Sequence, residues 1–142
     1  MPKIMKSLNR ISRAQALFRA KNLSDICPAH HAFIYAVCRS PGRSQDELAK
    51  DICLNKSTVA RALTSMEQAG LVRREPNPKD KRQSLVYPTE KTLELLPFIK
   101  ALSESWTSII TEGVSNEEMA IFERVLGKLE KNATEAIGGD IK

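Results

Sequence analysis

The stretch SQDELAKDICLNKSTVARALTSMEQAGLVRREPNPKDKRQSLVYPT, residues 44–89, decides how the rest of the chain is interpreted. Ser44 followed by Glu47 forms a capping box, in which side chains satisfy two backbone N–H groups at the start of a helix. Asn55 is a suitable cap for a second helix, and Gly70 suits the left-handed position that ends it. The sequence therefore predicts two short helices joined by a tight turn.

The second of these helices has two distinct faces. Val59, Leu63 and Met66 recur at intervals of four and three residues, which predicts an inner, buried face. Hydroxyl groups can bond phosphates or base edges, an arginine can pair with guanine, and a helix N-terminus favours a phosphate. We therefore expect the outer face to enter the major groove of DNA, using Asn55, Lys56, Ser57, Thr58, Arg61, Thr64 and Ser65.

A basic hairpin is predicted to follow. Residues 71–74 and 84–87 have the composition of two strands around a loop that contains two prolines. An arginine at such a tip is well suited to a minor groove, which makes Arg82 the leading candidate there. The expected DNA contacts of the hairpin are Arg73, Arg74, Lys79, Asp80, Lys81 and Arg82.

Each of these charges taken alone has an ordinary interpretation as a solvated surface group. Together, and in register with two helix caps, they favour DNA binding. The alternative is a winged-helix module that binds protein or RNA, for which an apolar recognition face would be the sign. No nucleophile elbow, zinc-binding helix motif or phosphate-binding glycine loop is present in the sequence, so we expect no enzymatic activity.

Long amphipathic helices are predicted on both sides of this core. Residues 3–22 form the first, Thr89 caps the second, and Ser115 with Glu118 makes a capping box for the third. Pro97 interrupts the second near its start. The apolar residues of the last two helices follow a heptad rhythm that one small domain cannot bury, so we expect a homodimer. The alternative is that the two seams pack on each other within one chain.

Composition agrees with a single compact unit. A chain of 142 residues suits one domain, with residues 28–89 as the core and residues 1–27 and 90–138 as dimerisation helices. Basic side chains predominate up to residue 82 and acidic ones from residue 90 onward, so the first part is expected to face a polyanion. No segment has the length and apolarity of a membrane span or the pattern of a signal peptide, which predicts a cytoplasmic protein.

These residues resemble the MarR family of bacterial transcriptional regulators. The family pattern is a helix-turn-helix, a leucine-valine-arginine strand, and a wing with an Asp-x-Arg motif, here Asp80-Lys81-Arg82. The resemblance implies a mainly α fold with a small β-hairpin wing (α+β), a dimer formed by the first and last helices, and Asp80 bracing the wing. Pro88 stands where leucine is usual, and His31 where glutamine is common.

The resemblance also implies a homodimeric repressor that binds a pseudo-palindromic operator and is released by a small-molecule effector or an oxidant. Candidate effector-cleft residues are His30, His31 and Tyr35, for which a purely structural role is the alternative. Cys27 is the candidate redox site, since a neighbouring helix N-terminus favours the reactive thiolate. Cys27 with His30 or His31 is a weaker candidate for a metal site, and no cofactor is expected.

Overall fold

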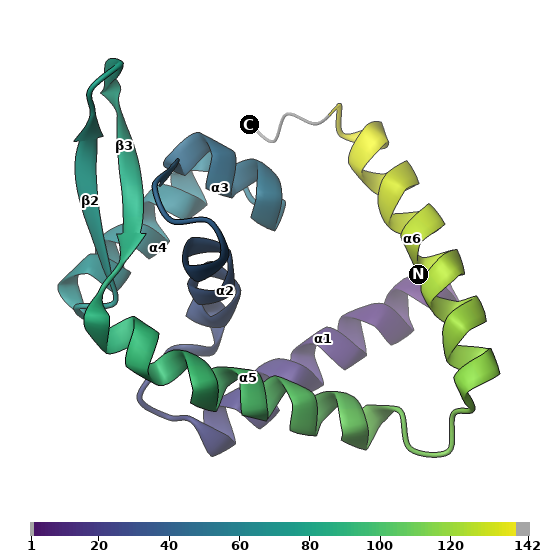
Figure 1. The fold of residues 1–142 in the computed structure, drawn as a ribbon. Helices are drawn as coiled ribbons and strands as arrows, with labels where there is room; N and C mark the ends of the chain where they lie inside the picture. The colour runs from purple at the N-terminus through teal and green to yellow at the C-terminus, as the bar shows by residue number, and fades with distance from the viewer. Residues whose placement is uncertain (1, 139–142) are drawn as a thin grey trace.

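In the computed structural model, which describes residues 2–138, six α-helices surround one small antiparallel sheet (Figure 1). The helices are α1 (Lys3–Asn22), α2 (His31–Arg39), α3 (Gln45–Ile52), α4 (Lys56–Gln68), α5 (Glu90–Ile110) and α6 (Asn116–Ala136), with a short 3-10 helix η1 (Pro28–His30) before α2. The strands are β1 (Arg43–Ser44), β2 (Val72–Asn77) and β3 (Asp80–Pro88). None of the helices in residues 2–138 has the length and apolar composition needed to cross a membrane.

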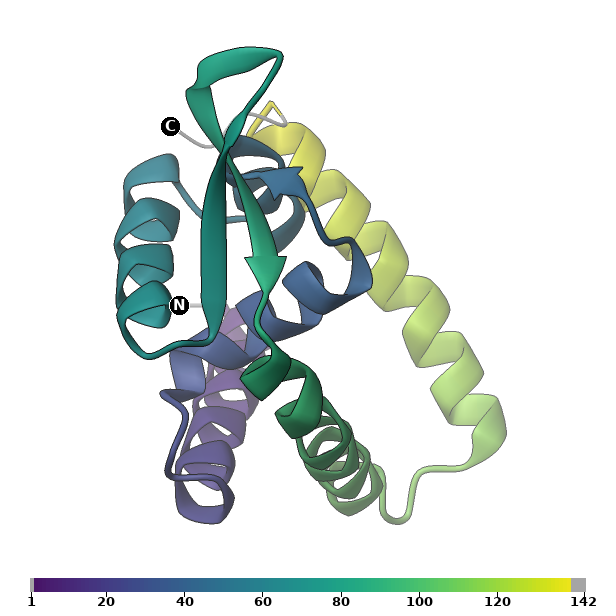
Figure 2. The ribbon, with the colours of Figure 1, turned by 60° about the vertical axis from the view of Figure 1, so that its left-hand side comes forward.

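The elements form a lobe and an array of long helices. The lobe contains α2, α3, α4 and the sheet, and the β2–β3 hairpin projects from it as a wing (Figure 1). Helix α5 leaves the base of the wing and crosses α1, and α6 returns beside the lobe without joining it (Figures 1 and 2). No residue of α1 or α6 is fully buried. The predicted mainly α fold with a hairpin wing is confirmed.

The hydrophobic core lies inside the lobe. The inner face of α4 is buried as its spacing predicts, with Val59, Leu63 and Met66 all inaccessible to solvent. Ile99 of α5 belongs to the same core, so the long helix is anchored to the lobe by packing. The other fully or nearly fully buried apolar residues of this cluster include Ile34, Val37, Leu48, Leu71, Val72 and Val86.

Three side chains also tie the start of α5 to the end of α4. The Thr89 hydroxyl donates to the Gly70 carbonyl at 2.6 Å, and the Thr92 hydroxyl donates to the Leu71 carbonyl at 2.5 Å. The Lys91 ammonium donates to the Ala69 carbonyl at 3.0 Å. These three carbonyls belong to the residues that directly follow α4, so the start of α5 is joined to the turn between α4 and β2.

The sheet is larger than the sequence predicts. The strands were expected at 71–74 and 84–87, but β2 and β3 extend to the hairpin tip, where Asn77 pairs with Asp80. Pro76 is tolerated in β2 because β2 is an edge strand of the sheet and has one side unpaired, and a register shift follows Pro76. The two-residue strand β1, which pairs with Val86 and Leu85, is too short to have a sequence pattern of its own.

Most of the predicted helix ends are confirmed. The side chains of Asn55, Thr89 and Ser115 accept hydrogen bonds from the backbone N–H three residues later, and Ser115 forms the full capping box with Glu118. The box expected at Ser44 is only half formed. Ser44 belongs to β1, and the Glu47 carboxylate accepts from its hydroxyl at 3.2 Å instead of from a backbone N–H.

Two proline positions differ in their effect. Pro28 begins η1, and α2 starts only at His31. Pro97 lies inside α5, which continues to Ile110. Because Pro97 has no N–H, the Leu93 carbonyl lacks its usual intrahelical donor.

Candidate nucleic-acid interface

Helix α4 presents an ordered N-terminus and an exposed polar face. Asn55 accepts the Thr58 N–H at 2.8 Å and the Ser57 hydroxyl at 3.0 Å, which fixes the first turn. Lys56 lies 3.4 Å from Asp46 of α3 in an exposed ion pair. The structure brings the predicted residues of this helix to one surface, with Thr58 half-buried and Lys56, Ser57, Arg61, Thr64 and Ser65 exposed.

Arg61 is the cation of α4 best placed to contact DNA. It is exposed, and within residues 2–138 its guanidinium has no hydrogen-bond or ion-pair partner. By contrast, the Thr64 hydroxyl donates to the Ala60 carbonyl at 2.9 Å within its own helix. A free guanidinium retains the two parallel donors that recognise guanine, whereas the Thr64 hydroxyl is already engaged.

The wing carries a second exposed cation, Arg82. The side chain of Arg82 is 92% exposed, which is the natural state of a group at a hairpin tip. Asp80 accepts both the Arg82 backbone N–H at 3.1 Å and its Nε at 3.3 Å, as expected of a residue that braces the wing. Asn77 adds a local turn by accepting the Lys79 N–H at 3.0 Å. Lys79 and Lys81 are both exposed beside Arg82.

The two arginines at the base of the wing point in different directions. Arg73 is half-exposed, forms an ion pair with Glu75, and places its guanidinium carbon 4.4 Å from the centre of the Tyr87 ring. The ring in turn lies against Gly42, where a Cβ would stand 3.2 Å from it. The Arg74 side chain is turned toward α3 and α4 and is only 22% exposed. Consecutive strand residues always point to opposite faces, but which of the two arginines faces α3 and α4 depends on how the sheet packs on these helices, and the sequence does not show that.

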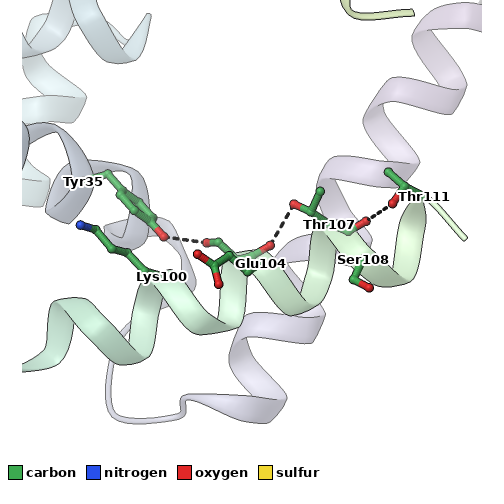
Figure 3. A pocket seen from close by; sticks show the side chains of 7 residues that line it. Tyr35, Lys100, Glu104, Thr107, Ser108 and Thr111 are labelled. Atoms are coloured by element: carbon green, nitrogen blue, oxygen red, sulfur yellow. Dashed lines mark hydrogen bonds between the residues drawn. The ribbon is translucent and has the colours of Figure 1, made fainter. Parts of the chain in front are cut away.

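Of the three predicted cleft residues, Tyr35 lines two hollows formed by the described residues. Its hydroxyl meets the Ser103 hydroxyl at 2.8 Å and the Ile99 carbonyl at 3.1 Å, and so bridges α2 to α5 (Figure 3). Two hollows of about 480 and 290 Å³ lie beside it, and both also include Lys100. The larger hollow is lined by a polar face of α5 that sequence reasoning missed, although its members recur at helical spacing: Lys100, Ser103, Glu104, Thr107, Ser108 and Thr111 (Figure 3).

The two histidines occupy the start of α2 instead. His31 is 1% exposed and does not line either of these hollows, and neither of its ring nitrogens has a hydrogen-bond partner within residues 2–138. Burial, reinforced by the nearby charges of Arg19 and His30, lowers the pKa of His31 to about 4. Burial also lowers the pKa of His30. His31 is therefore neutral near pH 7, which suits a packing role.

The cysteines remain separate thiols. Cys27 is exposed at the start of η1, and its carbonyl accepts the His30 N–H at 2.8 Å. Cys38 is half-buried against the smaller hollow, and burial raises the pKa of its thiol. Over residues 2–138, no three His, Cys, Asp or Glu side chains gather closely enough to hold a metal ion.

The chain is similar in sequence and in fold to known transcriptional regulators. The model of the MarR family matches residues 31–84. The transcriptional regulator HosA of Escherichia coli O111:H- is 31% identical over 107 residues, which cover 75% of this chain and 79% of HosA. The crystal structure of MarR is 27% identical, with a TM-score of 0.85 over 97% of this chain and 95% of its own.

A third protein is similar in fold and was crystallised on DNA. It is a putative MarR-family transcriptional regulator from Listeria monocytogenes in complex with a 26mer DNA. Its identity to this chain is 24%, and its TM-score is 0.86 over 96% of this chain and 92% of its own. At that identity the likeness concerns the fold.

Proposed function

The chain belongs to the MarR family of transcriptional regulators, and from that premise we propose that it is a homodimeric repressor of a pseudo-palindromic operator. The observation that carries the proposal is a pair of exposed cations on the lobe: Arg61 on α4, whose guanidinium has no partner within residues 2–138, and Arg82 on the wing, which stays 92% exposed beside Asp80. Helix α4 enters the major groove, and the wing reaches the adjacent minor groove. The complex of the Listeria monocytogenes protein with a 26mer DNA supports DNA binding by this fold.

Exposed apolar side chains on the long helices support the dimer. Because these residues follow the helical repeats of α1, α5 and α6, they form seams rather than isolated surface groups. A second copy of the chain would cover them and would place two lobes on one duplex. The seam includes Ile4, Met5 and Ile11 on α1, Ile109 and Ile110 on α5, and Ile121, Phe122, Val125 and Leu129 on α6.

Selection from a random-sequence duplex library tests the function. We expect the protein to enrich an inverted repeat whose half-sites are about one helical turn apart, and its affinity to fall steeply with salt. Gel-shift titration then compares the enriched duplex with a scrambled duplex of the same composition. Equal affinity for both duplexes would contradict an operator-binding role. Weak salt dependence would favour the alternative of a module that binds protein or RNA.

Arg61 and Arg82 are expected to differ in role, with Arg61 contributing sequence preference and Arg82 contributing general affinity for DNA. Arg61→Ala should lose about 1 to 3 kcal/mol of preference for the enriched duplex, because a guanidinium that reads base edges carries sequence information. Arg82→Ala should weaken binding to both duplexes by a similar factor. Fluorescence anisotropy on the two duplexes measures both quantities. Equal loss of affinity and of preference in both variants would refute this division.

Release by an effector forms the second part of the proposal. Tyr35 joins α2 of the lobe to α5. Lys100 lines both of the hollows that lie beside Tyr35. A small aromatic acid would find there a ring to pack on and an ammonium to pair with. Binding would alter how α2 sits on α5 and hence how far apart the two lobes stand. Oxidation of exposed Cys27 is the alternative trigger.

A panel of small aromatic acids, titrated against the protein–DNA complex, tests this site. We expect an acid that releases DNA from the wild type to require at least about tenfold more on Lys100→Ala, because a charge-assisted hydrogen bond contributes 1.5 to 3 kcal/mol. Cys27→Ser is the matched variant that tests release by oxidation. An effector that acts equally on wild type and Lys100→Ala would place its site elsewhere, and release by peroxide only in proteins that retain Cys27 would favour oxidation.

A further inference from the structure

Arg74 contacts both helices of the helix-turn-helix. Its Nη1 donates to Gln45 Oε1, at the start of α3, at 3.0 Å. Its Nη2 donates to Glu67 Oε1 at 3.1 Å and to the Thr64 hydroxyl at 3.3 Å, and its Nε lies 3.4 Å from Glu67 Oε2. All three guanidinium nitrogens are thus directed to partners within the lobe, and the pairing with Glu67 is bidentate.

The strand beneath Arg74 is fixed. Arg74 pairs across the sheet with Val86, which is 1% exposed and belongs to the core. The guanidinium therefore extends from a rigid base to the second half of α4. The hydrogen bond from Arg74 also lowers the pKa of Glu67, so that this carboxylate stays ionised in the pair.

Exposure separates Arg74 from the cations available to DNA. The Arg74 side chain is 22% exposed, whereas that of Arg82 is 92% exposed. A guanidinium that bound a phosphate would have to leave Glu67 and Gln45, whose oxygens would then lose their donor. Its net charge is already offset by Glu67, which lies on α4.

We propose that Arg74 is a positioning residue that sets the orientation of α4 against the wing and α3, and thereby determines sequence preference without contacting DNA. Thr64 lies one turn after Arg61 on α4, and its hydroxyl is held between the Ala60 carbonyl and Arg74. The direction in which Arg61 meets base edges therefore depends on a contact six residues further along the helix, at Glu67. This inference rests on the proposed operator binding and adds a determinant of its specificity.

Glu67→Gln gives the sharpest test, because two accounts of the Arg74–Glu67 pair predict different changes in DNA binding. If Arg74 and Glu67 were independent surface charges, removal of an anion near DNA would tighten binding to every duplex. If they position α4, preference for the enriched duplex over its scrambled counterpart should fall about tenfold, comparable to a mismatched base pair. Glutamine is isosteric with Glu67 and keeps one acceptor, and the site is 43% exposed, so folding should be retained.

Arg74→Ala and Arg82→Ala form a matched pair, since each removes one cation. Anisotropy titrations at several salt concentrations should show that Arg82→Ala reduces the slope of log affinity against log salt by about 1, the value for one phosphate contact. Arg74→Ala should leave that slope unchanged and lose about tenfold in preference. Arg74→Lys should not restore the preference, because an ammonium lacks the fork that binds Glu67 through two bonds.

Amide hydrogen exchange without DNA provides a readout that does not depend on operator binding. In Arg74→Ala, exchange should accelerate in residues 64–68 of α4 while the amides of α2 keep the rates of the wild type. Three results would each overturn the positioning role: unchanged exchange in α4 of Arg74→Ala, a salt slope reduced by about 1 in Arg74→Ala, or tighter binding of both duplexes by Glu67→Gln with unchanged preference. If the wild type failed to prefer the enriched duplex while α4 loosened in Arg74→Ala, the operator function would fall and the structural brace would stand.

Discussion

Trp106→Ala is expected to lower the stability of the protein by about 3 kcal/mol and to dissociate the proposed dimer. Trp106 of α5 packs on Phe18 of α1, with ring centres 5.2 Å apart and the planes tilted by 40°. This aromatic pair joins α1 to α5, the two long helices whose exposed seams would meet the second copy. Sedimentation equilibrium and urea unfolding measure the two effects.

Ser105→Ala is the matched control, because Ser105 is the exposed neighbour on the same helix. It should sediment and unfold like the wild type. A Trp106→Ala dimer of unchanged association and unchanged urea midpoint would refute both the packing role of the pair and its contribution to dimerisation.

Acid is expected to destabilise the wild type through His31 by about 3 kcal/mol between pH 7 and pH 4. The pKa of His31 in the folded protein is about 4, below the ordinary value of 6.5 that it regains on unfolding. Above pH 6.5 the residue is neutral in both states and contributes nothing. Between pH 6.5 and 4 only the unfolded state takes up the proton, so stability falls as the pH falls.

His31→Gln should remove this dependence, because glutamine carries no proton that titrates in this range. Urea midpoints of both proteins at pH 7, 5.5 and 4.5 isolate the effect, because the carboxylates titrate equally in each. The groups that face His31 are Arg19 and His30, and His30→Gln is the control that keeps the buried ring. Parallel pH profiles for wild type and His31→Gln would show that His31 gains a proton without cost in the folded state.

The features of the lobe that follow from local sequence could be predicted. The inner face of α4, its asparagine cap and its glycine end depend on residues within a few positions of one another, and each is present in the structure. The length of the wing could not be predicted, since proline lowers strand propensity and cross-strand pairing with β3 compensates for it. Strand β1 exists only because Val86 and Leu85 lie beside it.

The candidate site likewise contains features that local sequence predicts and features that depend on distant partners. The exposure of Arg61 and Arg82 follows from helical period and from position at a hairpin tip, both of which are legible in the sequence. The inward turn of Arg74 depends on strand register and on partners up to 29 positions away, as with Gln45. Likewise Tyr35 reaches Ser103, which is 68 positions away, and no local pattern signals that contact.

The hydrogen bonds between the start of α5 and the turn after α4 make a rotation of the long helix move the DNA-binding lobe with it. Helix α5 has 21 residues, about 30 Å of length, and its first turn grips Gly70 and Leu71 with the Thr89 and Thr92 hydroxyls. A tilt of about 5° at its far end would swing the clamped end by roughly 2.5 Å, close to the 3.4 Å step between base pairs. In a dimer joined at the C-terminal ends of α5, a small rotation at the joint would be enough to move the two DNA-binding lobes out of register with the grooves of the duplex.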